Sequence, residues 1–148
     1  MSADRSGTWA SRLLLPALLL PLVVGTIVVP GTARADGDPQ RGKREFLRCA
    51  TCHAAEPNVH KNGPSLATVY GRAAASVEGF GRYSNALKRA GVVWTEEALD
   101  AWLRDPKALV PGNTMIMPGI AEARVRLDLI AYLRELATRN PTAGGSTR

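Results

Sequence analysis

The sequence has no internal repeat, no long glycine- or serine-rich linker and no strand-like alternation of apolar and polar residues. The first two absences argue against several domains, and 148 residues are enough for one. The third argues against a β-sheet protein, because a half-buried strand alternates apolar and polar side chains. The sequence therefore predicts a single domain of the all-α class.

The sequence also lacks a large net charge. Of the 19 basic and 13 acidic side chains, three and one lie in residues 1–35, so residues 36–148 carry a net charge of +4. This excess is too small to indicate a nucleic-acid-binding protein. It is typical of a solvated surface, and it can also attract an acidic protein partner over a distance.

Residues 1–35 differ in composition from the rest. Two arginines precede an apolar run at residues 13–29, and the small-residue sequence Ala-Arg-Ala follows at residues 33–35. This order is typical of a secretory signal peptide that is removed after Ala35. The alternative is an uncleaved membrane anchor, because the run is not much shorter than the roughly 20 residues that cross a bilayer. Both interpretations place the domain, predicted at residues 36–139, outside the cytoplasm.

Caps, breakers and apolar spacing predict four or five short helices. They are expected from Asp38 to Cys49, from Ser84 to Ala90, from Thr95 to Asp105 and at about residues 121–138, with at most one helical turn at residues 66–70. The breaker-rich residues 50–76 are expected to form a loop, and the polar residues 140–148 a disordered tail. Helices this short enclose a thin core, so a buried cofactor is expected to supply apolar bulk.

The chemistry is concentrated in Cys49-Ala50-Thr51-Cys52-His53, which contains both cysteines of the chain. Its C-x-x-C-H pattern is the attachment motif of haem c, in which the two thiols form thioethers with the vinyl groups and the adjacent histidine binds the iron. The alternatives are a disulfide, a thioredoxin-like redox pair and a zinc site. A redox pair is expected near a βαβ pattern, which the sequence lacks, and the spacing is not the paired spacing usual for zinc.

One histidine leaves the sixth position of the iron to another side chain. The candidates outside residues 1–35 are Met115, Met117 and His60. Both methionines lie in a breaker-rich loop at residues 111–119, and spacing alone does not choose between them. A methionine ligand favours electron transfer, whereas an open position favours ligand binding or peroxide chemistry.

Several separated motifs resemble the class I cytochromes c, specifically the mitochondrial type and its soluble bacterial relatives. The resemblance covers nearly all of residues 37–139. It is carried by residues 42–53, 60–66, 111–115 and 128–133, in the order of the family. It implies a class I cytochrome c fold around one haem c, covalently bound at Cys49 and Cys52.

The resemblance also implies roles for individual residues. His53 and Met115 are the expected axial ligands of the haem iron, and the carbonyl group of Pro64 is expected to accept a hydrogen bond from the ring of His53. The residues expected at the haem propionates are Arg72, Tyr83 and Trp94. Met117 stands where the mitochondrial proteins carry an aromatic residue, so it competes with Met115 as a candidate ligand.

The function implied by the resemblance is that of a monohaem carrier of single electrons outside the cytoplasm, which is not an enzyme. The expected partners are an electron donor and an acceptor, for example a quinol-oxidising complex and a terminal oxidase or a dehydrogenase. The chain is expected to be a monomer in the periplasm, bound to the membrane only if residues 1–35 are retained. The rival interpretations are a haem enzyme or gas sensor whose Met115 dissociates, and a fixed subunit of a respiratory complex.

Overall fold

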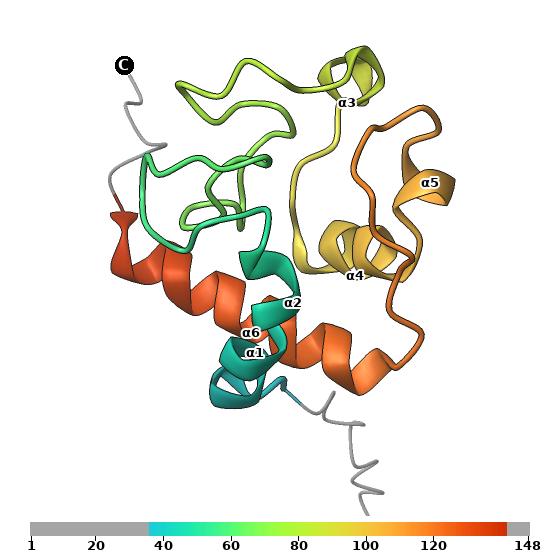
Figure 1. Ribbon diagram of the computed structural model, residues 1–148. Helices are drawn as coiled ribbons and strands as arrows, with labels where there is room; N and C mark the ends of the chain where they lie inside the picture. The colour runs from blue at the N-terminus through green and yellow to red at the C-terminus, as the bar shows by residue number, and fades with distance from the viewer. Residues whose placement is uncertain (1–35, 142–148) are drawn as a thin grey trace, which may run out of the picture. The chain divides into compact units, whose positions relative to one another are not determined.

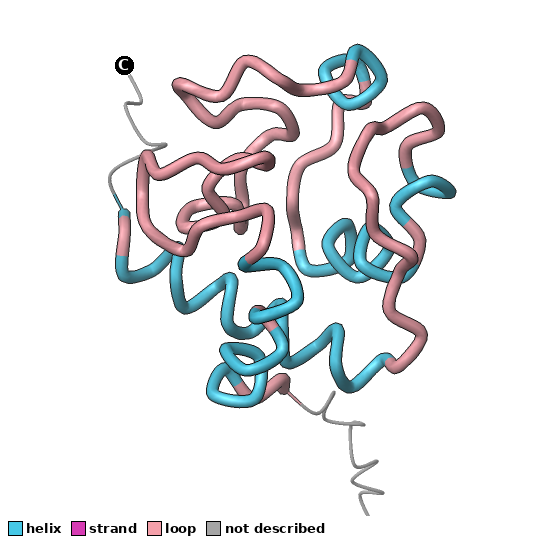
Figure 2. The backbone as a smooth tube through the Cα atoms, viewed as in Figure 1, coloured by secondary structure: helices cyan, strands magenta, loops and turns pink. Residues whose placement is uncertain are grey.

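The computed structural model describes residues 36–141, and helices are the only regular elements in that range (Figures 1 and 2). The helices are α1 (Pro39–Glu45), α2 (Leu47–Ala50), α3 (Asn85–Arg89), α4 (Glu96–Arg104), α5 (Pro106–Leu109) and α6 (Ala123–Arg139). Only Phe46 separates α1 from α2, so the two form one interrupted helix and the described part has five helices in this sense. The all-α class and the four to five short helices are thus confirmed. None of these helices is long and apolar enough to cross a membrane.

Three of the helices begin at the capping residues that the sequence indicates. The side chain of Asp38 accepts hydrogen bonds from the amides of Gln40 and Arg41 at the start of α1. Ser84 and Thr95 cap α3 and α4 in the same way. These caps are confirmed because each depends only on a polar side chain and the next three residues.

Other boundaries differ from the prediction. The predicted end of the first helix at Cys49 is one residue early, and the last helix begins and ends slightly later than predicted, at Ala123 and Arg139. Asp105 ends α4 as expected, but its side chain also caps a further short helix, α5, whose first residue is Pro106. Proline is well tolerated at that first position, since its missing amide hydrogen would have no partner there. Residues 66–70 form turns rather than a helical turn.

The two predicted terminal segments lie largely outside residues 36–141, which the structure describes. The predicted signal peptide at residues 1–35 lies outside the described residues. Of the predicted tail at residues 140–148, only Asn140 and Pro141 are described. The described residues belong to one compact unit that includes the whole predicted domain.

The central packing contact is the crossing of α1 and α6 (Figure 1). At Gly42 the two backbones come so close that an added Cβ atom would lie 1.9 Å from the carbonyl oxygen of Asp128. Next to this contact the rings of Phe46 and Tyr132 pack edge to face, with centroids 5.4 Å apart. The largest buried aliphatic side chains, Leu129 and Ile130, come from α6. The two ends of the domain are therefore held together by one tightly packed crossing.

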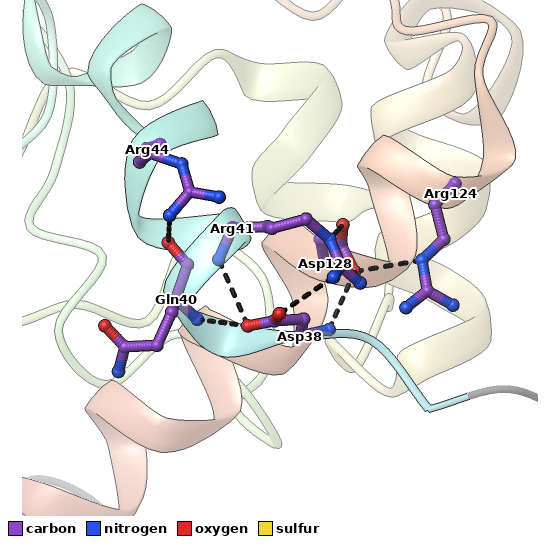
Figure 3. Close-up of polar contacts among 6 residues, drawn as sticks. All are labelled: Asp38, Gln40, Arg41, Arg44, Arg124 and Asp128. Atoms are coloured by element: carbon purple, nitrogen blue, oxygen red, sulfur yellow. Dashed lines mark hydrogen bonds and ion pairs between the residues drawn. The ribbon is translucent and has the colours of Figure 1, made fainter.

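An ionic cluster also joins α1 to α6 at this crossing (Figure 3). The carboxylate of Asp128 is only 4% exposed and accepts hydrogen bonds from the amide of Asp38 at 2.7 Å and from Nε and Nη2 of Arg41 at 2.7 and 3.1 Å. Arg41 also donates to the side chain of Asp38 at 2.8 Å, and Arg124 lies 3.4 Å from Asp128. The hydrogen bond from Arg41 is the main cause of a lowered pKa at Asp128, and the amide of Arg41 has the same effect on the pKa of Asp38.

The cluster leads to a prediction about acid stability. Because the pKa of Asp128 is lowered in the folded state, its stabilisation is present above the ordinary carboxyl pKa and is lost as the pH falls through the lowered value. Replacement of Asp128 by Asn is expected to reduce the free energy of unfolding by about 2 kcal/mol at pH 7, since charged hydrogen bonds are lost. This difference in unfolding free energy between the variant and the unmutated protein should become smaller as the pH falls towards 2. Urea unfolding between pH 2 and 7 measures this.

Asp36→Asn is the matched control, because it removes an exposed carboxylate from the same segment. Because Asp128 is intact in this control, its free energy of unfolding should fall between pH 7 and pH 2 as much as that of the unmutated protein. If Asp128→Asn lost as much stability at pH 2 as at pH 7, the cluster would not be the acid-sensitive element of the crossing.

Candidate functional site

A cavity of about 380 Å³ opens between the helices and the loops that follow Ala50 and Val110. This volume is in the range of sites for small ligands and cofactors. Its lining includes all eight predicted site residues: Cys49, Cys52, His53, Pro64, Arg72, Tyr83, Trp94 and Met115. Most of the remaining lining is apolar, contributed for example by Leu99, Trp102 and Leu133. The structure thus brings together residues that are spread over 67 positions of the sequence.

The two cysteines and His53 meet at the end of α2. The amide of His53 donates to the carbonyl oxygen of Cys49 at 2.9 Å, a helical turn that places the two residues on one side of the backbone. Both thiols are free, with Cys49 half-buried and Cys52 exposed. Burial raises the pKa of Cys49. A raised pKa disfavours a thioredoxin-like pair, whose reactive cysteine needs a lowered one.

A zinc site is also disfavoured. Within residues 36–141, no group of three or more His, Cys, Asp or Glu side chains is arranged to hold a metal ion. A structural zinc ion usually has four such ligands.

His60, the third candidate for the sixth ligand of the iron, does not line the cavity. Its Nε2 lies 2.9 Å from the carbonyl oxygen of Glu78 and its Nδ1 accepts from the amide of Ser65 at 3.1 Å, so both ring nitrogens are engaged between loops.

The ring of His53 is fixed by its neighbours. Its Nδ1 lies 2.7 Å from the carbonyl oxygen of Pro64, the contact that the resemblance implies. Because a carbonyl oxygen only accepts, Nδ1 carries the hydrogen and Nε2 keeps a free lone pair. Burial lowers the pKa of His53, with the Pro64 contact acting in the opposite direction. The neutral imidazole that a metal ion needs is therefore favoured.

Gly63 supports this ring in a way that the sequence did not indicate. A Cβ atom at position 63 would lie 2.3 Å from Cε1 of His53 and 2.7 Å from Nδ1. The amide of Gly63 donates to the carbonyl oxygen of Cys52 at 2.7 Å, which holds the backbone against the ring. The only sequence signal was the turn-forming pair Gly63-Pro64, which predicts a bend but not what lies beneath it.

The methionine segment lines the cavity with five consecutive residues, 113–117. Burial alternates along it, since Met115 and Met117 are half-buried whereas the intervening Ile116 is fully exposed. Asn113 fixes this segment: its Nδ2 donates to the carbonyl oxygens of Pro106 and Val110 at 2.8 and 2.9 Å, and its Oδ1 accepts from the amide of Met115 at 3.1 Å. The backbone of Met115 is thus held by a side chain, and the choice between the two sulfur atoms stays open.

The residues expected at the propionates, Arg72, Tyr83 and Trp94, all line the cavity. Backbone hydrogen bonds join Arg72 to Trp94, since the Trp94 amide donates to the Arg72 carbonyl oxygen at 2.8 Å. The guanidinium of Arg72 donates to the hydroxyl of Thr68 and to the carbonyl oxygen of Ser76, both at 2.7 Å. Burial raises the pKa of Tyr83, so its hydroxyl stays protonated as a hydrogen-bond donor. Arg82, which the sequence analysis did not single out, also lines the cavity.

These groups fit a haem. The cavity is lined by two thiols, by a histidine with a free Nε2, by two methionine side chains and by many apolar side chains. Arg72 and Arg82 contribute positive charge without a carboxylate partner among the described residues. A largely apolar macrocycle with two carboxylates complements such a lining, since unneutralised cations in a cavity favour an anionic ligand.

Known proteins support the same assignment. No family model matches the chain, but a cytochrome c of Euglena viridis is 45% identical over 101 residues, which is 68% of this chain and 98% of that protein. A cytochrome c2 of Blastochloris viridis is 39% identical over 114 residues, covering 76% of this chain and 87% of the relative. The solved structure of cytochrome cH from Methylobacterium extorquens is similar with a TM-score of 0.63 and 38% identity, over 67% of this chain and 99% of that one. The chain therefore belongs to the class I cytochromes c, monohaem electron carriers with a covalently bound haem c.

Proposed function

We propose that this protein is an exported one-electron carrier in which Cys49 and Cys52 hold the haem as thioethers and His53 and Met115 bind its iron. The observation that carries the proposal is that these four side chains line one apolar cavity although Met115 is 62 positions beyond His53. The free Nε2 lone pair of His53 and the thioether sulfur of Met115 would be the two groups that hold the iron, and hydrogen bonds fix the ring of the first and the backbone of the second.

The haem, when bound, supplies an iron that cycles between the ferrous and ferric states. The chain supplies the environment that makes the cycle useful. Pro64 orients the ring of His53 through its carbonyl oxygen, and the apolar lining would keep water from the metal. Arg72, Tyr83 and Trp94, which also line the cavity, would bind the two propionates. A thioether ligand raises the reduction potential, which favours electron transfer.

A carrier without enzymatic activity is the function that this arrangement favours over a haem enzyme. An enzyme needs an open or easily vacated position on the iron. Here Asn113 joins the backbone of Met115 to the carbonyl oxygens of Pro106 and Val110, so a movement of the whole segment away from the cavity would break several hydrogen bonds. This favours a closed coordination sphere.

The proposal extends to place and partners. The signal-like residues 1–35 support export to the periplasm, with a membrane-anchored form as the alternative. Electrons would pass between a donor and an acceptor protein, such as a quinol-oxidising complex and a terminal oxidase or dehydrogenase, with the carrier as a monomer. The small positive charge supports weak, transient docking rather than a permanent complex.

Optical spectra of the mature haem-containing protein test the ligand assignment. The ferric protein should show the charge-transfer band of an iron–methionine bond. Met115→Ala should abolish this band, and the ferrous form of that variant should bind carbon monoxide rapidly and stoichiometrically. Met117→Ala is the matched control, because it removes the same thioether two residues away, and it should keep the band.

Two results would contradict the proposal in different ways. Loss of the band only in Met117→Ala would assign the second methionine as the ligand. Absence of the band in the unmutated protein, together with rapid carbon monoxide binding, would favour the ligand-binding haem enzyme.

A further inference from the structure

We infer that Arg82 is a second guanidinium that binds a carboxylate of the haem, in addition to the expected Arg72. The inference rests on the proposed haem site and assigns to it a positioning residue that neither the motif nor the family resemblance indicated. It is supported by the position of the Arg82 side chain, by its contacts, by the positive charges that line the cavity, and by the lack of a carboxylate partner for Arg82 among the described residues.

Arg82 is one of the arginines that line the cavity, together with Arg72 and Tyr83. Its guanidinium carbon is 5.2 Å from the centroid of the Phe80 ring, and that ring packs edge to face on Tyr83 with centroids 4.8 Å apart. Phe80 itself is only 9% exposed. Arg82 is therefore linked through a buried ring to Tyr83, one of the residues expected at the propionates.

Arg82 is exposed, but a hydrogen bond to a neighbouring loop holds its side chain. Its Nη2 donates to the carbonyl oxygen of Lys61. The amide of Lys61 in turn donates to the carbonyl oxygen of Gly63 at 3.0 Å, and its Nζ donates to that of Ala50 at 2.5 Å. This places Arg82 against the loop that also carries the histidine contact of Pro64. An arginine has five N–H donors, so most of those on Arg82 are left for a ligand.

The charges of the lining are unbalanced. Arg48, a third arginine of the cavity, is paired with Glu45 at 2.5 Å. Neither Arg72 nor Arg82 has a carboxylate partner among residues 36–141, and both donate only to neutral oxygens. Two like charges that line one largely apolar cavity repel each other, and an anionic ligand would reduce this repulsion. A planar guanidinium is well suited to bind a carboxylate with two hydrogen bonds.

The pH dependence of the reduction potential tests this role. An ionised propionate stabilises ferric iron, so the potential rises when the pH falls far enough to protonate it. A guanidinium bound to the carboxylate keeps it ionised to lower pH. Replacement of Arg82 by Gln should therefore move the onset of this rise upward by about one pH unit, within the one to three units typical of a lost charge partner. Arg82→Lys, which keeps the charge but not the fork of donors, should restore part of the shift.

Arg48→Gln is the matched control, because it removes the same charge from the same cavity but from an arginine already paired with Glu45. It should leave the onset unchanged. His60 contacts Phe80 with ring centroids 5.7 Å apart, and Lys61, Arg72 and Tyr83 are the other charged or titratable groups around Arg82. All four are present in every variant, so they contribute equally to the pH dependence of the reduction potential in each. The potential is measured by spectroelectrochemical titration from pH 4.5 to 8.

The outcomes separate this inference from the proposed function. An unmoved onset in Arg82→Gln, or the same movement in Arg48→Gln, would overturn the role of Arg82 and leave it as a solvated surface charge. The iron–methionine band is recorded on the same samples. Its absence from the unmutated protein would refute the ligand assignment, whereas an intact band with an unmoved onset would refute only the role of Arg82.

Discussion

Replacement of Gly63 by alanine is expected to displace the ring of His53 and weaken its bond to the haem iron by about 10- to 100-fold, the usual cost when a ligand's supporting contact is lost. The added Cβ atom would lie 2.3 Å from Cε1 of the ring, well inside van der Waals contact. The ring has little freedom to move, because its Nδ1 is tied to the carbonyl oxygen of Pro64 at 2.7 Å. Relief of the clash therefore breaks the contact that orients the ligand.

Acid titration of the ferrous protein measures this effect. Protons compete with the iron for Nε2 of His53, so a 10- to 100-fold weaker bond should be lost at a pH about one to two units higher. The free energy of unfolding should fall by about 3 kcal/mol, since overpacking and a lost hydrogen bond add together. Gly81→Ala is the matched control, because a Cβ atom there meets nothing within 4 Å. An acid titration of Gly63→Ala that matched the control would contradict the role given to Gly63.

Replacement of Gly42 by valine is expected to separate α1 from α6 and to cost about 3 kcal/mol of unfolding free energy or more. The first added carbon would lie 1.9 Å from the carbonyl oxygen of Asp128 and 2.8 Å from Cβ of Tyr132. Both are backbone or near-backbone atoms of α6 and cannot rotate away. Separation of the helices would also pull Phe46 from Tyr132 and stretch the contacts between Arg41 and Asp128.

Guanidinium unfolding followed by circular dichroism measures the change. Lys43→Val is the matched control, because it introduces the same β-branched side chain at the next, exposed position of α1. It should cost less than about 1 kcal/mol, the range of helix propensities. Equal losses in the two variants would show that valine acts through the conformation of α1 and not through the crossing.

The sequence predicts the local features of this fold well. The caps at Asp38, Ser84 and Thr95 depend on a hydrogen bond to an amide two or three residues ahead, so the pattern contains all that decides them. The haem-attachment motif is equally local, and separated motifs in the family order lead to eight site residues that line one cavity. The helix at Pro106 was missed because Asp105 was interpreted only as an end, although the same residue begins the next helix.

Three features that depend on distant contacts were not predicted. Gly63 was visible as a turn residue, but the ring it supports lies ten positions earlier in the chain. Asn113 belongs to the breaker-rich loop at residues 111–119, but the sequence did not indicate that its side chain joins three backbone groups, those of Pro106, Val110 and Met115. Arg82 has no local pattern at all, because its significance comes from Phe80 and Lys61 folding around it. The assignments of the iron ligands and propionate contacts stay predictions until the spectra are measured.

The crossing of α1 and α6 also sets an order of events during synthesis. The amide of Asp38 and the carboxylate of Asp128 that accepts its hydrogen bond are separated by 90 positions. Since a ribosome delivers the chain from its amino end, Gly42 has no native surface to pack on until the final helix has been made. The last helix, α6, begins 70 positions after His53. The attachment motif is therefore complete long before the crossing that closes the domain can form.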